Sequence, residues 1–194
     1  LAQAIGLGDL EIGDRAGEAR RLSVLAQHHI ANEEYEKARL NLNQSQSICE
    51  EVGDLERLTY TLMMQGVIEF VTLQFEQALT ILERGRAITQ KLNKDARLCE
   101  YDNLIGIIFL YQNQPEQAQP YIIRSLQSAE ASGQLYLKWL SLMGYAQYLW
   151  HTEQSNLSVR ITAVVYRQRD LGGVLDRRFL FAPHIYRVEQ YIGE

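Results

Sequence analysis

The chain has 194 residues, of which 46% are hydrophobic and 22% are charged, and its net charge is −5. This length can bury one ordinary core, and this composition is typical of a folded globular domain. The acidic balance and the lack of long basic runs exclude a basic nucleic-acid footprint and a polybasic membrane patch. Only 3 prolines occur, so long helices are possible along almost the whole chain.

The sequence predicts a cytoplasmic protein without a transmembrane helix, because no stretch approaches ~18 consecutive apolar residues and no signal peptide is visible. The chain begins with Leu1 and not with methionine. We therefore expect a piece of a longer protein, in which residues 1–14 are the tail of a preceding repeat.

A 40-residue period runs through the sequence, because Gly66 and Gly106 are 40 residues apart and equal steps in either direction give Ala26 and Ala146. Three further columns keep this register without insertion or deletion. They are Ala38, Ala78, Ala118 and Ser158; Leu42, Leu82, Ile122 and Thr162; and Gly13, Gly53, Asn93, Gly133 and Gly173. Small residues let two helices approach to ~8 Å, and Gly or Asn suits the left-handed conformation that ends a helix. The period therefore predicts stacked helical hairpins, in which Leu42 and its equivalents fill the space above the small residues.

Between these positions, apolar residues recur at three- and four-residue steps, which is typical of amphipathic helices. In chain order we predict helices over residues 15–31, 35–52, 55–71, 75–92, 95–111, 115–132, 134–151 and 155–171. The expected fold is a single all-α domain over residues 1–194, with four hairpin repeats and a capping helix. The repeats are residues 15–54, 55–94, 95–133 and 134–173, and the capping helix is residues 174–194. Pro115 suits the first turn of its helix, whereas Pro120 lies inside that helix and is expected to bend it.

The columns resemble the tetratricopeptide repeat. The Leu-Gly pair of that repeat corresponds to Leu25-Ala26, Gln65-Gly66, Ile105-Gly106 and Tyr145-Ala146, and its second-helix alanine corresponds to Ala38 and the equivalents of Ala38. The repeat length of 40 departs from the usual length of about 34 residues, and the usual terminal proline is absent. The resemblance implies a right-handed α-α superhelix, that is, a tetratricopeptide-like solenoid.

Repeats of 40 residues are similar to those of large ATP-dependent bacterial transcription activators and related signalling ATPases. The last segment, from Leu171 to Glu194, resembles the closing helix of those regulators. This resemblance implies the sensor or interaction arm of a bacterial protein in signal transduction or transcription regulation.

The residues that could carry chemistry do not form a catalytic pattern. Cys49 and Cys99 lack the spacing of metal ligands, so we expect two part-buried free thiols. His28 and His29 are adjacent and point about 100° apart on a helix, so they cannot chelate one metal ion as an i, i+4 pair can. The glycine pair at Gly172 is not followed by the Gly-Lys-Ser/Thr of a phosphate-binding loop. We therefore expect a protein that is not an enzyme and needs neither a metal nor a cofactor.

In tetratricopeptide repeats the first helices line the concave face, so the resemblance implies a partner-binding groove there. The expected groove residues are Arg20, Gln27, Tyr60, Met63, Met64, Val67, Glu100, Asn103, Ile107, Tyr111, Met143, Gln147, Trp150 and His151, with Val24 on the same face. All three methionines of the chain fall in this set, and Met, Tyr and Trp are common at adaptable interfaces. An amphipathic helix of a protein or peptide partner fits such a lining. Alternatively, these side chains pack against one another or against the second helices.

Three functions stay open at this point. The first is a scaffold that binds a protein or peptide segment, with no nucleic acid and no membrane as a partner. The second is a sensor that binds a small effector in a polar pocket around Glu100, Asn103 and His151. The third is a structural spacer that associates with itself as a homodimer.

Overall fold

The computed structural model describes residues 14–172, and every regular element in that range is an α-helix. The helices are α3 (Arg15–Ala31), α4 (Tyr35–Val52), α5 (Leu55–Val71), α6 (Phe75–Lys91), α7 (Asp95–Tyr111), α8 (Pro115–Ser132), α9 (Leu135–His151) and α10 (Ser155–Gly172). Each helix begins and ends within one residue of its predicted bounds, so the predicted helices are confirmed. The expected tail over residues 1–14, except for residue 14, and the expected capping helix over residues 174–194 lie outside the described residues.

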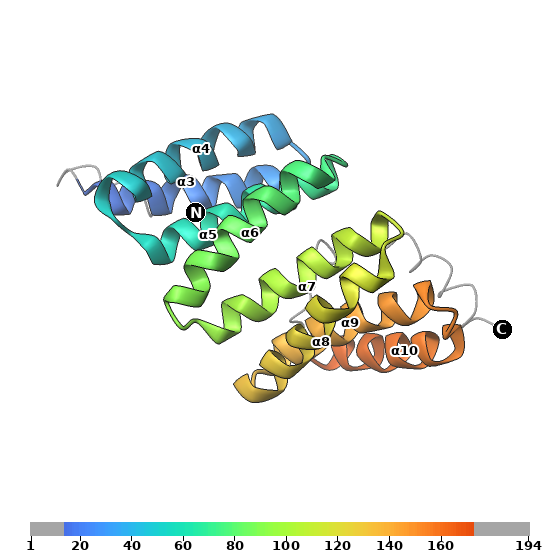
Figure 1. Ribbon diagram of the computed structural model, residues 1–194. Coiled ribbons are helices and arrows are strands. Elements are labelled where there is room, and N and C mark those ends of the chain that lie inside the picture. The colour runs from blue at the N-terminus through green and yellow to red at the C-terminus, as the bar shows by residue number, and fades with distance from the viewer. Residues whose placement is uncertain (1–13, 173–194) are drawn as a thin grey trace. The chain divides into compact units, whose positions relative to one another are not determined.

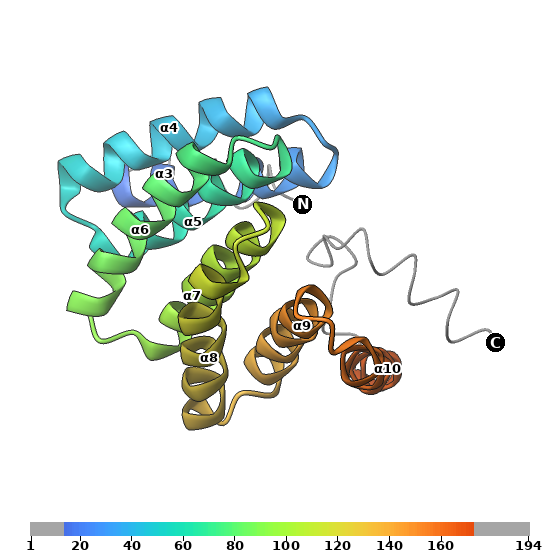
Figure 2. The same cartoon turned by 45° about the vertical axis from the view of Figure 1, so that its right-hand side comes forward.

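Consecutive helices pair as hairpins, α3 with α4, α5 with α6, α7 with α8 and α9 with α10 (Figure 1). The chain divides into two compact units, Leu1–Asn93 (unit 1) and Lys94–Glu194 (unit 2). In unit 1, α5 packs against both α3 and α4, and in unit 2, α9 packs against both α7 and α8 (Figure 2). Each unit is therefore two hairpins stacked in the same manner, a repeat-like helical array. In the described part of the chain, no helix has the length and hydropathy that crossing a membrane requires.

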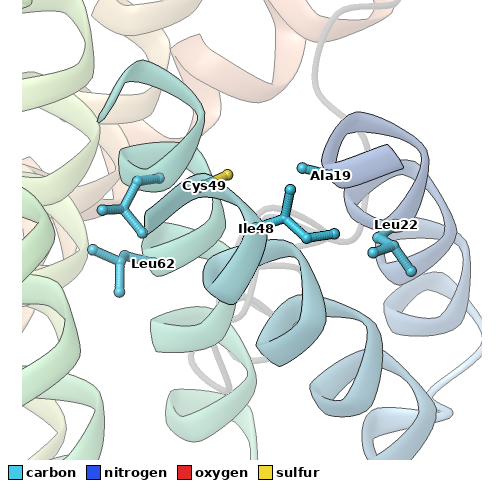
Figure 3. Packing of buried hydrophobic residues seen from close by; sticks show 6 residues of the cluster. Ala19, Leu22, Ile48, Cys49 and Leu62 are labelled. Carbon is cyan, nitrogen blue, oxygen red and sulfur yellow. The ribbon is translucent and has the colours of Figure 1, made fainter. Parts of the chain in front are cut away.

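The core of unit 1 joins four helices. Figure 3 shows Ile48 of α4 pointing toward Ala19 and Leu22 of α3, while Leu62 of α5 lies on the side of Cys49. Leu58 belongs to the same cluster, and α6 adds the partly buried Ile81 and Ile88. Burial of each large aliphatic side chain contributes about 1.5–3 kcal/mol, so this cluster holds the two hairpins of unit 1 together.

The small residues on the first helices lie opposite the large aliphatic residues on the second helices. A β-carbon added to Gly66 would lie 2.4 Å from Cδ2 of Leu82, and one added to Gly106 would lie 2.7 Å from Cδ1 of Ile122. Both large side chains are fully buried. The prediction that Leu82 and Ile122 fill the space above the small residues is therefore confirmed.

The turns between hairpins have the predicted left-handed residue. The φ angles are +71° at Gly53, +53° at Asn93 and +67° at Gly133, and the equivalent Gly13 and Gly173 lie outside the described residues. A second left-handed series, which the sequence analysis did not predict, occurs inside the hairpins. It consists of Glu33, Leu73, Asn113 and Glu153, with φ between +58° and +62°.

The turns inside the hairpins share one hydrogen bond, from the backbone N–H that follows the left-handed residue to a carbonyl five residues earlier. Its lengths are 2.9 Å from Glu34 to His29, 2.8 Å from Gln74 to Glu69, 2.9 Å from Gln114 to Phe109 and 2.9 Å from Gln154 to Leu149. This bond satisfies a carbonyl at the end of the first helix, so all four hairpins close in the same way.

In unit 2, Pro115 is at the start of α8 as predicted, and Pro120 is an exposed residue inside the same helix. Proline has no N–H to donate, so Pro120 leaves one helical carbonyl without its donor. Because the position is exposed, water can bond to that carbonyl instead. Buried clusters among the described residues of this unit include one around Met143 and Val165 and one around Cys99, Ala129 and Leu137.

Candidate partner-binding surface

Hydrogen bonds from α4 show which face of α5 is covered by the preceding hairpin. Ser45 lies 3.2 Å from the Thr61 hydroxyl, and the amide of Gln65 donates to Gln46 at 2.9 Å. Further along, Arg39 donates from Nε and Nη2 to the two carboxylate oxygens of Glu69 at 2.9 and 3.0 Å, and from Nη2 to the Thr72 hydroxyl at 2.9 Å. The face of α5 that carries residues 61, 65 and 69 is therefore the face that meets the preceding hairpin.

The same register applied to α3 separates two of its faces. Residues 61, 65 and 69 of α5 correspond to Arg21, Leu25 and His29 of α3, which are 40 positions earlier and half-buried. Arg20, Val24 and Gln27 occupy a neighbouring face, at steps of four and three residues, and all three are exposed. We call these three residues the α3 stripe.

Six of the predicted groove residues belong to unit 1. Arg20 and Gln27 are exposed on α3, and Tyr60 is half-buried on α5. The structure brings Gln27 and Tyr60 together, because Nε2 of Gln27 donates a hydrogen bond to the Tyr60 hydroxyl. The remaining three, Met63, Met64 and Val67, are buried, with exposed fractions of 6%, 5% and 9%.

The other eight predicted groove residues belong to unit 2. Glu100, Ile107, Tyr111 and Trp150 are half-buried, Asn103, Met143 and Gln147 are buried, and His151 is exposed. All three methionines of the chain are thus buried, which favours the alternative that these side chains pack inside the protein.

A cluster on α7 and α9 surrounds Glu100. Its carboxylate accepts from Nη1 of Arg97 at 3.0 Å and from the Tyr136 hydroxyl at 3.4 Å. Burial raises the pKa of Glu100 and, together with the Glu100 charge, raises the pKa of Tyr136. The sequence-based prediction included Glu100 but neither Arg97 nor Tyr136. Arg97 could have been found, because it precedes Glu100 by three residues on the same helix. Tyr136 could not, because it lies on a different helix and no sequence pattern relates the two positions.

Asn103 lies against Gly144, and the Asn103 side chain occupies the space that a β-carbon on residue 144 would need. A β-carbon on Gly144 would lie 2.0 Å from Oδ1 of Asn103, and this buried oxygen accepts no hydrogen bond from the described residues. The contact fixes the register of α7 against α9. Glu100 precedes Asn103 by three residues and His151 follows Gly144 by seven, so their levels along the helices differ by about 15 Å. The structure therefore does not bring Glu100 and His151 together in one pocket.

The sequence did not predict the two ion pairs of the described residues in which the carboxylate is buried, although the repeat register reveals one of them. Asp102 occupies the column of Leu22, Leu62 and Leu142, yet it is only 2% exposed and accepts from Arg124 at 3.3 Å. The other pair is the contact of Arg39 with Glu69. A carboxylate in a leucine column is a signal that a cation lies close enough to pair with it.

Neither thiol is placed for chemistry. Cys49 and Cys99 are free and fully buried, which confirms the expectation of free thiols and shows deeper burial than expected. Burial raises the pKa of both thiols, that of Cys99 to about 11, so neither is a thiolate at neutral pH. Within residues 14–172, no group of three His, Cys, Asp or Glu side chains is arranged to hold a metal ion.

These features define an all-α protein built as a repeat-like array of helical hairpins. No protein-family model matches the chain, and no curated protein matches its sequence.

Proposed function

We propose that this chain is a protein- or peptide-binding scaffold of tetratricopeptide-like repeats. In this proposal it is the sensor or interaction arm of a bacterial signalling or transcription-regulatory protein in the cytoplasm. The ligand is a peptide segment that meets the first helices of the hairpins, as the resemblance to tetratricopeptide repeats implies.

The observation that carries this proposal is a contrast between two sets of equivalent positions. The packing column of the second helices is nearly constant, since Ala38, Ala78, Ala118 and Ser158 are all small and fully buried. The first-helix columns change in charge and size from repeat to repeat. Two such columns are Arg20, Tyr60, Glu100 and Leu140, and Val24, Met64, Leu104 and Gly144. Constant packing positions beside variable first-helix positions are expected where a repeat protein binds a ligand through its first helices. Of the eight variable positions, Arg20 and Val24 are the exposed ones, so the proposal relies on these two.

The experiment selects ligands without assuming their sequence. A random peptide library displayed on phage is selected against the whole chain, and the affinity of the enriched peptides is measured by calorimetry. Val24→Asp places a charge on the exposed part of a first helix, and Leu40→Asp is the matched control on the second helix of the same hairpin. Val24 is 39% exposed and Leu40 is 60% exposed, so neither change disturbs the core.

We expect Val24→Asp to weaken the selected peptides about tenfold or more and Leu40→Asp to leave their affinity unchanged. If the library yields no enriched peptide, the scaffold function is wrong. If Leu40→Asp weakens binding and Val24→Asp does not, the second helices form the binding face and the assignment to the first helices is wrong.

A further inference from the structure

Arg20 of the α3 stripe lacks an acidic partner among the described residues, in contrast to three other arginines of unit 1. Arg15 donates to Glu51 on α4, Arg39 to Glu69 on α5, and Arg84 on α6 to Glu50 on α4. Each of these guanidinium groups therefore joins two helices. Arg20 is exposed, and its guanidinium makes no ion pair and no hydrogen bond in the part of the chain that the structure describes.

An exposed apolar side chain lies directly beside this unpaired charge. Val24 is one helical turn after Arg20 and is 39% exposed, although most apolar side chains on the first helices are buried or half-buried. Gln27 follows one turn later and is held by its hydrogen bond to Tyr60 of α5. The stripe thus presents a cation, an aliphatic group and a fixed amide over about 10 Å of helix.

We infer that the α3 stripe binds a peptide segment that places a carboxylate side chain against Arg20 and an aliphatic side chain against Val24. The inference rests on the proposed function and adds the chemistry of the ligand to it. The positions of Arg20 and Val24 differ by about 6 Å along α3. Side chains at i and i+4 of a helical peptide, or at i and i+2 of an extended one, have this spacing. The partner is an acidic and aliphatic peptide and not a nucleic acid, since one arginine can pair with one carboxylate, whereas a nucleic acid needs several cations along its backbone.

A charge reversal at Arg20 tests this chemistry directly. The peptide selection is carried out in parallel on the wild-type chain and on Arg20→Glu, with Arg160→Glu as a control that removes an exposed arginine from α10. The wild-type chain and Arg160→Glu are expected to enrich peptides with an acidic residue two or four positions from an aliphatic one. Arg20→Glu is expected to enrich basic residues at the acidic position instead.

A binding measurement gives the same test a magnitude. The best acidic peptide and its version with the carboxylate replaced by the isosteric amide are titrated into the three proteins at low and high salt. The acidic peptide should bind the wild-type chain about threefold to tenfold more tightly than the amide version at low salt. This preference should vanish in Arg20→Glu and persist in Arg160→Glu.

Four results would overturn the inference. Enriched peptides without an acidic residue, or an acidic preference that Arg20→Glu does not change, would exclude Arg20 as the site while leaving the proposed function intact. Dimerisation that increases with concentration and is abolished by Arg20→Glu in light scattering would assign the stripe to a second copy of the chain. A selection that enriches no peptide in any of the three proteins would remove the proposed function together with the inference.

Discussion

Replacing Gly66 by alanine tests whether the small column sets the distance between helices α5 and α6. The new β-carbon would lie 2.4 Å from Cδ2 and 2.5 Å from Cγ of Leu82, whose side chain is fully buried. Carbon atoms in favourable contact are about 3.5–4.0 Å apart, so Leu82 or α6 must move by about 1 Å. Overpacking of this kind costs about 1–3 kcal/mol, whereas alanine in place of glycine inside a helix contributes about 1 kcal/mol. We therefore expect Gly66→Ala to lower the free energy of unfolding by about 1 kcal/mol.

Urea unfolding followed by circular dichroism measures this change, and a double-mutant cycle with Leu82→Ala isolates its cause. Leu82→Ala alone leaves a cavity and should cost about 2–5 kcal/mol. In that background the added methyl group has room, so Gly66→Ala should stabilise the protein by about 1 kcal/mol. The two changes should then show a coupling energy of about 1–3 kcal/mol. A coupling energy of zero, with Gly66→Ala stabilising in both backgrounds, would refute the reasoning that Leu82 requires a glycine opposite it.

Three further outcomes are expected. Leu73 is 67% exposed and has a φ of +61°, so Leu73→Gly should relieve strain and raise the free energy of unfolding by about 0.5–1 kcal/mol, whereas an equal gain from Leu73→Ala would contradict this cause. The raised pKa values of Cys49 and Cys99 predict that an aromatic disulfide reagent labels neither thiol in the native protein at about pH 8. The same reagent should label both thiols in urea. For Glu100, whose folded pKa lies above 4.5, the cost of burying the charge is absent below pH 4.5, grows as the pH rises toward the folded pKa and is constant above it. Glu100→Gln should therefore raise the Tm at neutral pH, and a Tm difference that does not shrink in acid would show that another effect causes it.

The helices could be predicted from the sequence because the same boundary residues recur at equivalent positions of several repeats. Gly53, Asn93 and Gly133 occupy equivalent positions, and each has the left-handed backbone that this residue type allows. The turns inside the hairpins offered no such signal. Their left-handed residues include Leu73 and Glu153, which do not favour that conformation, so packing of the two helices imposes it.

The candidate surface was less predictable than the fold, because burial depends on how far each helix lies from its neighbours. Met64 and Val24 are equivalent in the repeat, yet Met64 is 5% exposed and Val24 is 39% exposed. Helical periodicity assigns both residues to one face and carries no information on what covers that face. Long-range pairs such as Arg39 with Glu69 are hidden for the same reason, since 30 residues separate the two side chains in the sequence.

The contact of Arg39 with Glu69 also bears on how a chain of similar repeats folds in the right order. Hairpins with nearly the same packing columns can stack in the wrong sequence, and such misassembly is a characteristic hazard of repeat proteins. The positions equivalent to Glu69 in the later repeats are Phe109 and Leu149, neither of which can accept a hydrogen bond from a guanidinium side chain. Among the described hairpins, only the second therefore offers Arg39 a carboxylate at this position, so the pair favours the correct neighbour of the first hairpin over the later ones.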